Sequence, residues 1–221
     1  MKKRSSNTHN WWMGKVRSVD AGKKLRLVPY WERGLSPSDR IHIIIDPGPA
    51  FGVGDHPTTL MALELLEHAV AETNRPEPTM LDVGTGTGVL AIAAKALGTG
   101  LTVGLDTDPA AVFTAKRNVG LNTQGDRGGL SHIPLLITTA DGIRGPFDIV
   151  AANLAAPTLL KLHSSLRSLT GGALVLSGIA DAMIGEVLAV YDSGGLELVT
   201  RLEREGWHAA LLGRNRPHER K

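Results

Sequence analysis

Residues 81–88 read Leu-Asp-Val-Gly-Thr-Gly-Thr-Gly and join a short apolar run, residues 80–83, to an Ala-rich segment with helical spacing, residues 89–97. Glycine lets a backbone turn tightly and approach a ligand closely. The GxGxG spacing differs from the GxGxxG of dinucleotide sites, and the Gly-Lys-Ser/Thr ending of a Walker loop is absent. We interpret this stretch as a strand-to-helix loop that holds a ligand, the alternative being a tight turn without one.

Strand and helix patterns alternate from this loop toward both ends of the chain. Short apolar runs predict strands at residues 80–83, 101–105, 133–138, 147–151 and 173–177, the last entered through a turn at Gly171 and Gly172. Helical spacing predicts helices at residues 60–71, 89–97, 109–121, 157–169 and 181–191. Residues 196–203 and 207–212 predict a closing hairpin, and residues 11–45 short strands or an extended segment leading into a strand. The alternation predicts an α/β fold whose mostly parallel sheet is covered on both faces and gains an antiparallel edge.

Composition narrows the class of protein. The chain has 221 residues, 42% hydrophobic and 21% charged, which is typical of a globular protein. The absence of Cys excludes disulfides, thiolate metal sites and cysteine nucleophiles. No apolar run is long enough to span a membrane, and the basic start lacks the apolar core of a secretory signal. We therefore expect a cytoplasmic enzyme, with basic ends that serve as solubilising tails or as a weak handle for a ribonucleoprotein.

Acidic residues follow two of the predicted strands. Asp106 ends the strand at residues 101–105, where a carboxylate can accept hydrogen bonds from both ribose hydroxyls of an adenosine ligand. Asp108 precedes Pro109 and suits the N-cap of the next helix. Asp141 lies either near the adenine or in a turn before Gly142. Together with the glycine loop, Asp106 indicates an adenosine ligand.

Two further segments carry polar residues next to predicted elements. Asn153 follows the strand at residues 147–151 and would either hold a substrate amine or cap the next helix. Residues 46–59 are rich in Gly, Pro and polar side chains, which is typical of a functional or a disordered loop. Within it Phe51 could pack on a ligand, whereas His56 has no second ligand at metal spacing, and we expect no metal site.

The runs IDPGPAFGVGDHPTT, LDVGTGTGVLAIAAKALG, VGLDTDPAAVFTAKRN, DIVAANLAA and LVLSGI resemble, in this order, the PrmA-type ribosomal protein methyltransferases. The resemblance covers about residues 20–213. It implies a Rossmann-like class I fold dependent on S-adenosylmethionine (SAM), with a mostly parallel seven-stranded sheet and a C-terminal antiparallel hairpin. It also implies SAM as cofactor and a protein substrate, ribosomal protein L11, methylated on lysine or N-terminal amino groups. Neither membrane nor direct nucleic-acid binding is implied.

The resemblance also implies roles for single residues. Asn153 corresponds to the asparagine at the methyl-transfer centre, and is the catalytic residue that we expect. Cofactor-binding positions would be Asn153 itself together with Phe51, Gly52, Thr59, Gly84, Gly86 and Asp106. The implied organisation is a linker-like segment at residues 1–45, a methyltransferase domain at residues 46–213 and a basic tail at residues 214–221.

This sequence departs from the family pattern in two places. Val53 and Asp55 stand where the family usually has threonines, so a negative charge lies near the expected cofactor entrance, unless Asp55 only caps the loop. Residues 1–45 resemble the family's linker, so the substrate-recognition domain that precedes it in family members is not represented. Two alternatives therefore stay open: a methyltransferase with the same core acting on another protein or a small molecule, and a non-catalytic SAM-binding module.

Overall fold

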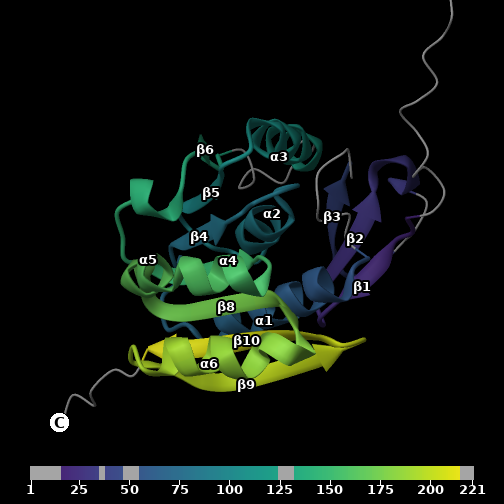
Figure 1. Ribbon diagram of the computed structural model, residues 1–221. Coiled ribbons are helices and arrows are strands. Elements are labelled where there is room, and N and C mark those ends of the chain that lie inside the picture. Colours follow the sequence, from purple (N-terminus) through teal and green to yellow (C-terminus); the bar gives the residue numbers. More distant parts are fainter. Residues whose placement is uncertain (1–15, 35–37, 47–54, 124–131, 215–221) are drawn as a thin grey trace, which may run out of the picture.

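A seven-stranded sheet forms the centre of the protein (Figure 1). The computed structural model describes residues 16–34, 38–46, 55–123 and 132–214. The strands of the sheet are β4 (Met80–Val83), β5 (Thr102–Asp106), β6 (Leu135–Ile137), β7 (Phe147–Asn153), β8 (Thr170–Ala180), β9 (Leu196–Arg204) and β10 (Trp207–Arg214). Their order is β6-β5-β4-β7-β8-β10-β9, in which β10 pairs antiparallel with both β8 and β9 and the other neighbours pair parallel. The predicted mostly parallel sheet with an antiparallel C-terminal hairpin is confirmed.

Two helical layers cover the sheet, as Figure 1 shows. One face carries α1 (Pro57–Glu72) and α2 (Val89–Ala96), with α3 (Pro109–Asn122) beside α2. The other carries α4 (Ala156–Lys161), α5 (His163–Leu169) and α6 (Ile184–Asp192), while short 3-10 turns lie at η1 (Tyr30–Glu32), η2 (Ala140–Gly142) and η3 (Asp181–Met183). Because side chains alternate along a strand, Val175 of β8 packs with the first layer and Leu174 and Leu176 with the second. Within the described residues, none of the helices has the length and apolarity needed to cross a bilayer.

A smaller sheet of β1 (Val19–Ala21), β2 (Leu25–Pro29) and β3 (Ile41–Ile45) lies beside α1, α2 and α3. Its β3 edge is closed by two asparagines one helical turn apart on α3. Asn122 exchanges hydrogen bonds with the N–H and C=O of Ile44, and Asn118 with those of Asp46. Since Asn118 also donates to the Thr87 carbonyl at 2.9 Å, it connects this sheet to the glycine loop.

Two local predictions are wrong. Gly171 and Gly172 were predicted to form a turn, but they lie inside β8, and a Cβ on Gly172 would come within 2.7 Å of the Asp148 carbonyl of β7. Glycine is needed there for the close approach of two strands and not for a change of direction. The helix predicted at residues 157–169 is two short helices, α4 and α5, which meet at Leu162.

Candidate functional site

The loop between β4 and α2 depends on its glycines. Gly84, Gly86 and Gly88 all have positive φ, at 75°, 55° and 81°. A Cβ on Gly84 would come within 2.4 Å of the Leu154 side chain, and one on Gly88 within 3.0 Å of Ala115. Both conformation and space therefore require glycine, and the loop lies close to the segment that follows β7.

Asp82 of β4 holds this loop in place through hydrogen bonds. Its Oδ2 accepts hydrogen bonds from the Thr85 hydroxyl at 2.7 Å and the Ala91 N–H at 3.2 Å, whereas its buried Oδ1 has no partner among the described residues. Burial raises the pKa of the Asp82 carboxyl from 3.8 to about 7, against the opposing effect of these two hydrogen bonds. The sequence marks an acid before the first glycine but gives no sign of its burial, so this role was missed.

Asp106 lies at the end of β5, facing the same loop. Its Oδ2 accepts from the Gly86 N–H and its Oδ1 from the Asp108 N–H, both at 3.0 Å. An ionised carboxylate offers about four lone-pair sites, so each oxygen can accept one more hydrogen bond. Asp108 itself caps α3 by accepting from the Ala110 N–H at 2.8 Å, as its sequence position predicted.

A cavity of about 330 Å³ opens over the carboxyl ends of the parallel strands. It is lined by Gly84, which follows β4, by Asp106 at the end of β5, and by Leu154, which follows β7. Asp141 lines it too and accepts a hydrogen bond from the Ser165 hydroxyl of α5, so it both faces the cavity and sits in the turn η2. The carboxyl ends of parallel strands are where ligands bind in open α/β sheets. A larger groove, of about 800 Å³ between α1, β9 and the β1–β2 turn, is lined by none of the predicted site residues.

Asn153 is the last residue of β7 and directly precedes Leu154, which lines this cavity. Its Nδ2 donates to the Thr59 hydroxyl at 3.4 Å, while its buried Oδ1 has no hydrogen-bond partner within the described part of the chain. The N-cap of α4 is Ala155 and not Asn153, which excludes the helix-capping alternative. Gly178 of β8 leaves room here, because a Cβ on it would lie 3.2 Å from the Asn153 Oδ1. Asn153 therefore carries a buried acceptor whose hydrogen-bonding capacity is unused among the described residues.

The start of α1 contacts Asn153 through the Thr59 hydroxyl. Thr59 is fully buried in the first helical turn, and the Thr58 carbonyl accepts from the Ser177 hydroxyl of β8 at 2.8 Å. His56 is the N-cap of α1, where its Nδ1 accepts from the Thr58 N–H, and its ring meets Trp207 edge-on at 5.4 Å. Asp55 is exposed. The predicted residues Phe51 and Gly52 lie outside the described residues.

Comparisons with known proteins assign this arrangement to a family. The family model described as "Ribosomal protein L11 methyltransferase (PrmA)" matches residues 3–215. The chain belongs to this family. It is 38% identical to the ribosomal protein L11 methyltransferase of Myxococcus xanthus over 198 residues, which cover 90% of this chain and 66% of that protein. Identity to the Dictyoglomus thermophilum protein of that name is 36%, with 93% and 65% covered.

Solved structures share the fold of this chain. A ribosomal protein L11 methylase from Lactobacillus delbrueckii subsp. bulgaricus superposes with a TM-score of 0.77 at 27% identity, over 91% of this chain and 99% of that one. A magnesium protoporphyrin IX methyltransferase from Synechocystis with bound SAM has the same fold, with a TM-score of 0.59 at 18% identity over 70% of this chain and 78% of that one. The chain spans just under two thirds of the length of the curated family members that it matches.

Proposed function

We propose that this PrmA-family chain binds SAM in the cavity over β4 and β5 and transfers its methyl group to amino groups of ribosomal protein L11, a reaction of the cytoplasm. The observation that carries the proposal is the unpartnered Asn153 Oδ1 beside a cavity lined by Gly84 and Asp106. The proteins that this chain resembles at 36–38% identity carry the name of that activity, which supports the substrate class.

The residues of the cavity fit such a cofactor. Asp106 retains a free lone pair on each oxygen, which suits the two ribose hydroxyls of an adenosine. The carboxylate already accepts hydrogen bonds from two backbone N–H groups, which hold it in one orientation. Little conformational entropy is therefore lost when a ligand binds. The loop at Gly84 and Gly86 lets the backbone come close to the methionine part, and Phe51 and Gly52 would cover it, as the family resemblance implies.

Bound SAM supplies a methyl group on a positively charged sulfur, which is already activated for transfer. Asn153 then has one task, which is to accept an N–H of the neutral substrate amine through Oδ1 and point its lone pair along the line of attack. A free lysine has a pKa near 10.4 and must lose a proton first, and a partly desolvated site beside a sulfonium favours its neutral form. Alignment of this kind contributes up to roughly 7–11 kcal/mol. Thr59 holds the Asn153 amide and so acts as a positioning residue.

The proposed methyltransferase unit is residues 46–213, with residues 1–45 leading into it and residues 214–221 as a basic tail. The leading segment is packed against the unit, since Leu25 and Ile43 share one apolar cluster with Met61 of α1. This packing supports a fixed position for β3, the strand that precedes the proposed unit.

The test is incubation of the purified chain with radiolabelled SAM and a ribosomal extract. A labelled band at L11 is the expected result. Label on another protein or on small molecules would reject L11 as substrate, and SAM binding without any transfer would reject the enzymatic proposal.

Two variants separate the proposed roles. Asn153→Ala removes the orienting acceptor, and we expect turnover to fall about a hundred-fold while the Kd for SAM stays within about three-fold. Asp106→Ala removes two charge-assisted hydrogen bonds, and we expect SAM binding to weaken about ten- to a hundred-fold. Calorimetry with SAM measures both affinities, and equal loss of turnover and affinity in Asn153→Ala would contradict its assignment.

A further inference from the structure

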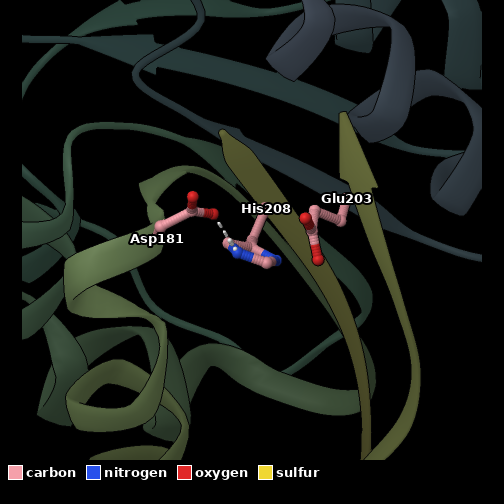
Figure 2. Close-up of side chains that lie close together, drawn as sticks. All are labelled: Asp181, Glu203 and His208. Carbon is pink, nitrogen blue, oxygen red and sulfur yellow. Dashed lines mark hydrogen bonds and ion pairs between the residues drawn. The ribbon is translucent and has the colours of Figure 1, made fainter. Parts of the chain in front are cut away.

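Asp181, Glu203 and His208 form a side-chain cluster at one end of the C-terminal hairpin (Figure 2). Asp181 opens η3 directly after β8, Glu203 lies near the end of β9, and His208 is the second residue of β10. One ligand atom from each lies within 4.8 Å of the other two. Sequence spacing could not reveal this group, because strand pairing alone brings the three residues together.

The backbone fixes the positions of all three residues. Glu203 and His208 are direct cross-strand partners in the β9–β10 ladder, so their side chains leave the same face of the sheet. The Asp181 N–H donates to the Gly206 carbonyl at 3.2 Å, which ties η3 to the turn of the hairpin. The cluster is thus held by main-chain hydrogen bonds and does not depend on a flexible loop.

His208 is the group that points to a ligand. The residue is only 4% exposed, and its Nε2 lies 2.6 Å from the Asp181 Oδ1. In the tautomer that donates its Nε2 proton to that carboxylate, the ring carries its lone pair on Nδ1. Nδ1 is buried and has no hydrogen-bond partner among the described residues. Figure 2 shows the ring between the two carboxylates, with its second nitrogen turned to the side of Glu203.

The charge of the cluster also favours a cation. Within residues 16–34, 38–46, 55–123 and 132–214, no Lys or Arg forms an ion pair with Asp181 or Glu203, and the nearby Arg204 is paired with Glu64 of α1. A histidine whose other ring nitrogen donates to a carboxylate is the usual arrangement of a metal ligand, because the carboxylate orients the ring and raises its basicity. Imidazole with carboxylate oxygen suits zinc and its neighbours, whereas Mg²⁺ and Ca²⁺ prefer oxygen alone.

We propose that His208, through Nδ1, and Glu203 bind a divalent transition-metal cation of the zinc class, with Asp181 orienting the ring through Nε2. The side chain of Glu203 is exposed enough to rotate onto an ion at about 2.0–2.2 Å. The site is separate from the proposed methyl-transfer centre. Trp207 packs with the α1 layer, and its strand neighbour His208 therefore projects from the opposite face of the sheet.

The test is titration of the full, chelator-treated chain with ZnCl₂ by calorimetry, with Co²⁺ absorption as a second readout. We expect wild-type protein to bind one Zn²⁺ at this site and Mg²⁺ far more weakly. His208→Gln and Glu203→Gln should each weaken Zn²⁺ binding at least about ten-fold and remove the cobalt absorption band. Glu205→Gln, an exposed acid in the turn of the same hairpin, is the matched control and should bind as wild type does.

The Glu203→Gln variant keeps the test valid if His208→Gln fails to fold, because Glu203 is on the surface. The chain has eight histidines, so Zn²⁺ binding by wild type is not sufficient support by itself. Absence of Zn²⁺ binding, equal affinity for Mg²⁺, or unchanged Zn²⁺ affinity in Glu203→Gln would overturn the proposal.

Discussion

Replacing Asp82 with Asn should remove a pH dependence of stability that the buried carboxyl imposes on the fold. An Asn amide keeps one oxygen, which can still accept from the Thr85 hydroxyl and the Ala91 N–H. Its amino group takes the place of the oxygen that has no partner. The variant therefore keeps the loop contacts and loses only the ability to ionise.

The sign follows from the raised pKa. Between pH 3.8 and about 7 the folded chain holds the Asp82 proton and the unfolded chain has lost it, so stability falls as pH rises through this window. Each unit of pKa shift is worth about 1.4 kcal/mol. The shift from 3.8 to about 7 thus corresponds to roughly 4 kcal/mol in total, of which about 2–3 kcal/mol is lost between pH 5 and pH 8. The loss is nearly complete about one pH unit above the folded-state pKa.

Urea denaturation followed by circular dichroism, at pH 5, 6, 7 and 8 without cofactor, measures the effect. Histidines titrate in both proteins alike, so the quantity to compare is the difference in unfolding free energy between wild type and Asp82→Asn. We expect this difference to shift by about 2–3 kcal/mol in favour of the variant from pH 5 to pH 8. Asp192→Asn, at an exposed position, is the control and should follow wild type. Parallel curves for wild type and Asp82→Asn would refute the buried, proton-holding carboxyl.

Further predictions concern packing and hydrogen bonds. Gly84→Ala and Gly98→Ala both place a side chain at positive φ, but only the side chain at position 84 would meet a neighbour. In urea denaturation, Gly84→Ala should therefore lower the free energy of unfolding by about 1–3 kcal/mol more than Gly98→Ala does. Asn122→Ala leaves the N–H and C=O of Ile44 without their buried partner and should destabilise the fold by about 2–3 kcal/mol in the same assay. Tyr191→Phe removes a buried hydroxyl that donates to a carbonyl of α4 and should cost about 1 kcal/mol, measured as a lowered Tm.

Much of the fold follows from local signals. The strand predicted at residues 80–83 is β4 with the same bounds, because an apolar run ends there in glycines that only a turn accommodates. Pro57 and Pro109 both stand at the first turn of a helix, as their fixed φ favours. The glycine pair at 171–172 was misjudged because a turn and a close strand contact use the same residue, and only the position of β7 decides between them.

The site was predictable only in part. Asp106 ends one predicted strand and Asn153 follows another, so their place at one edge of the sheet follows from the parallel topology. The contact between Asn153 and Thr59 joins residues 94 positions apart and depends on how α1 packs across β7. The burial of Asp82 also depends on tertiary packing, since no neighbouring residue in the sequence indicates it. Properties that depend on tertiary packing were the ones that sequence reasoning missed.

The same topology explains why the hairpin brings His208 to the functional edge. Parallel strands deliver only their last residues to that edge, as β7 delivers Asn153 and β8 is followed there by Asp181. β10 runs antiparallel to β8, so it contributes its first residues, and the two-residue turn at Glu205 and Gly206 sets which ones these are. In this register His208 lies opposite Glu203, and because side chains alternate along a strand, both side chains leave the same face of the sheet. The cluster with Asp181 therefore depends on the register of β10 with β8 and β9 as much as on the identity of its side chains.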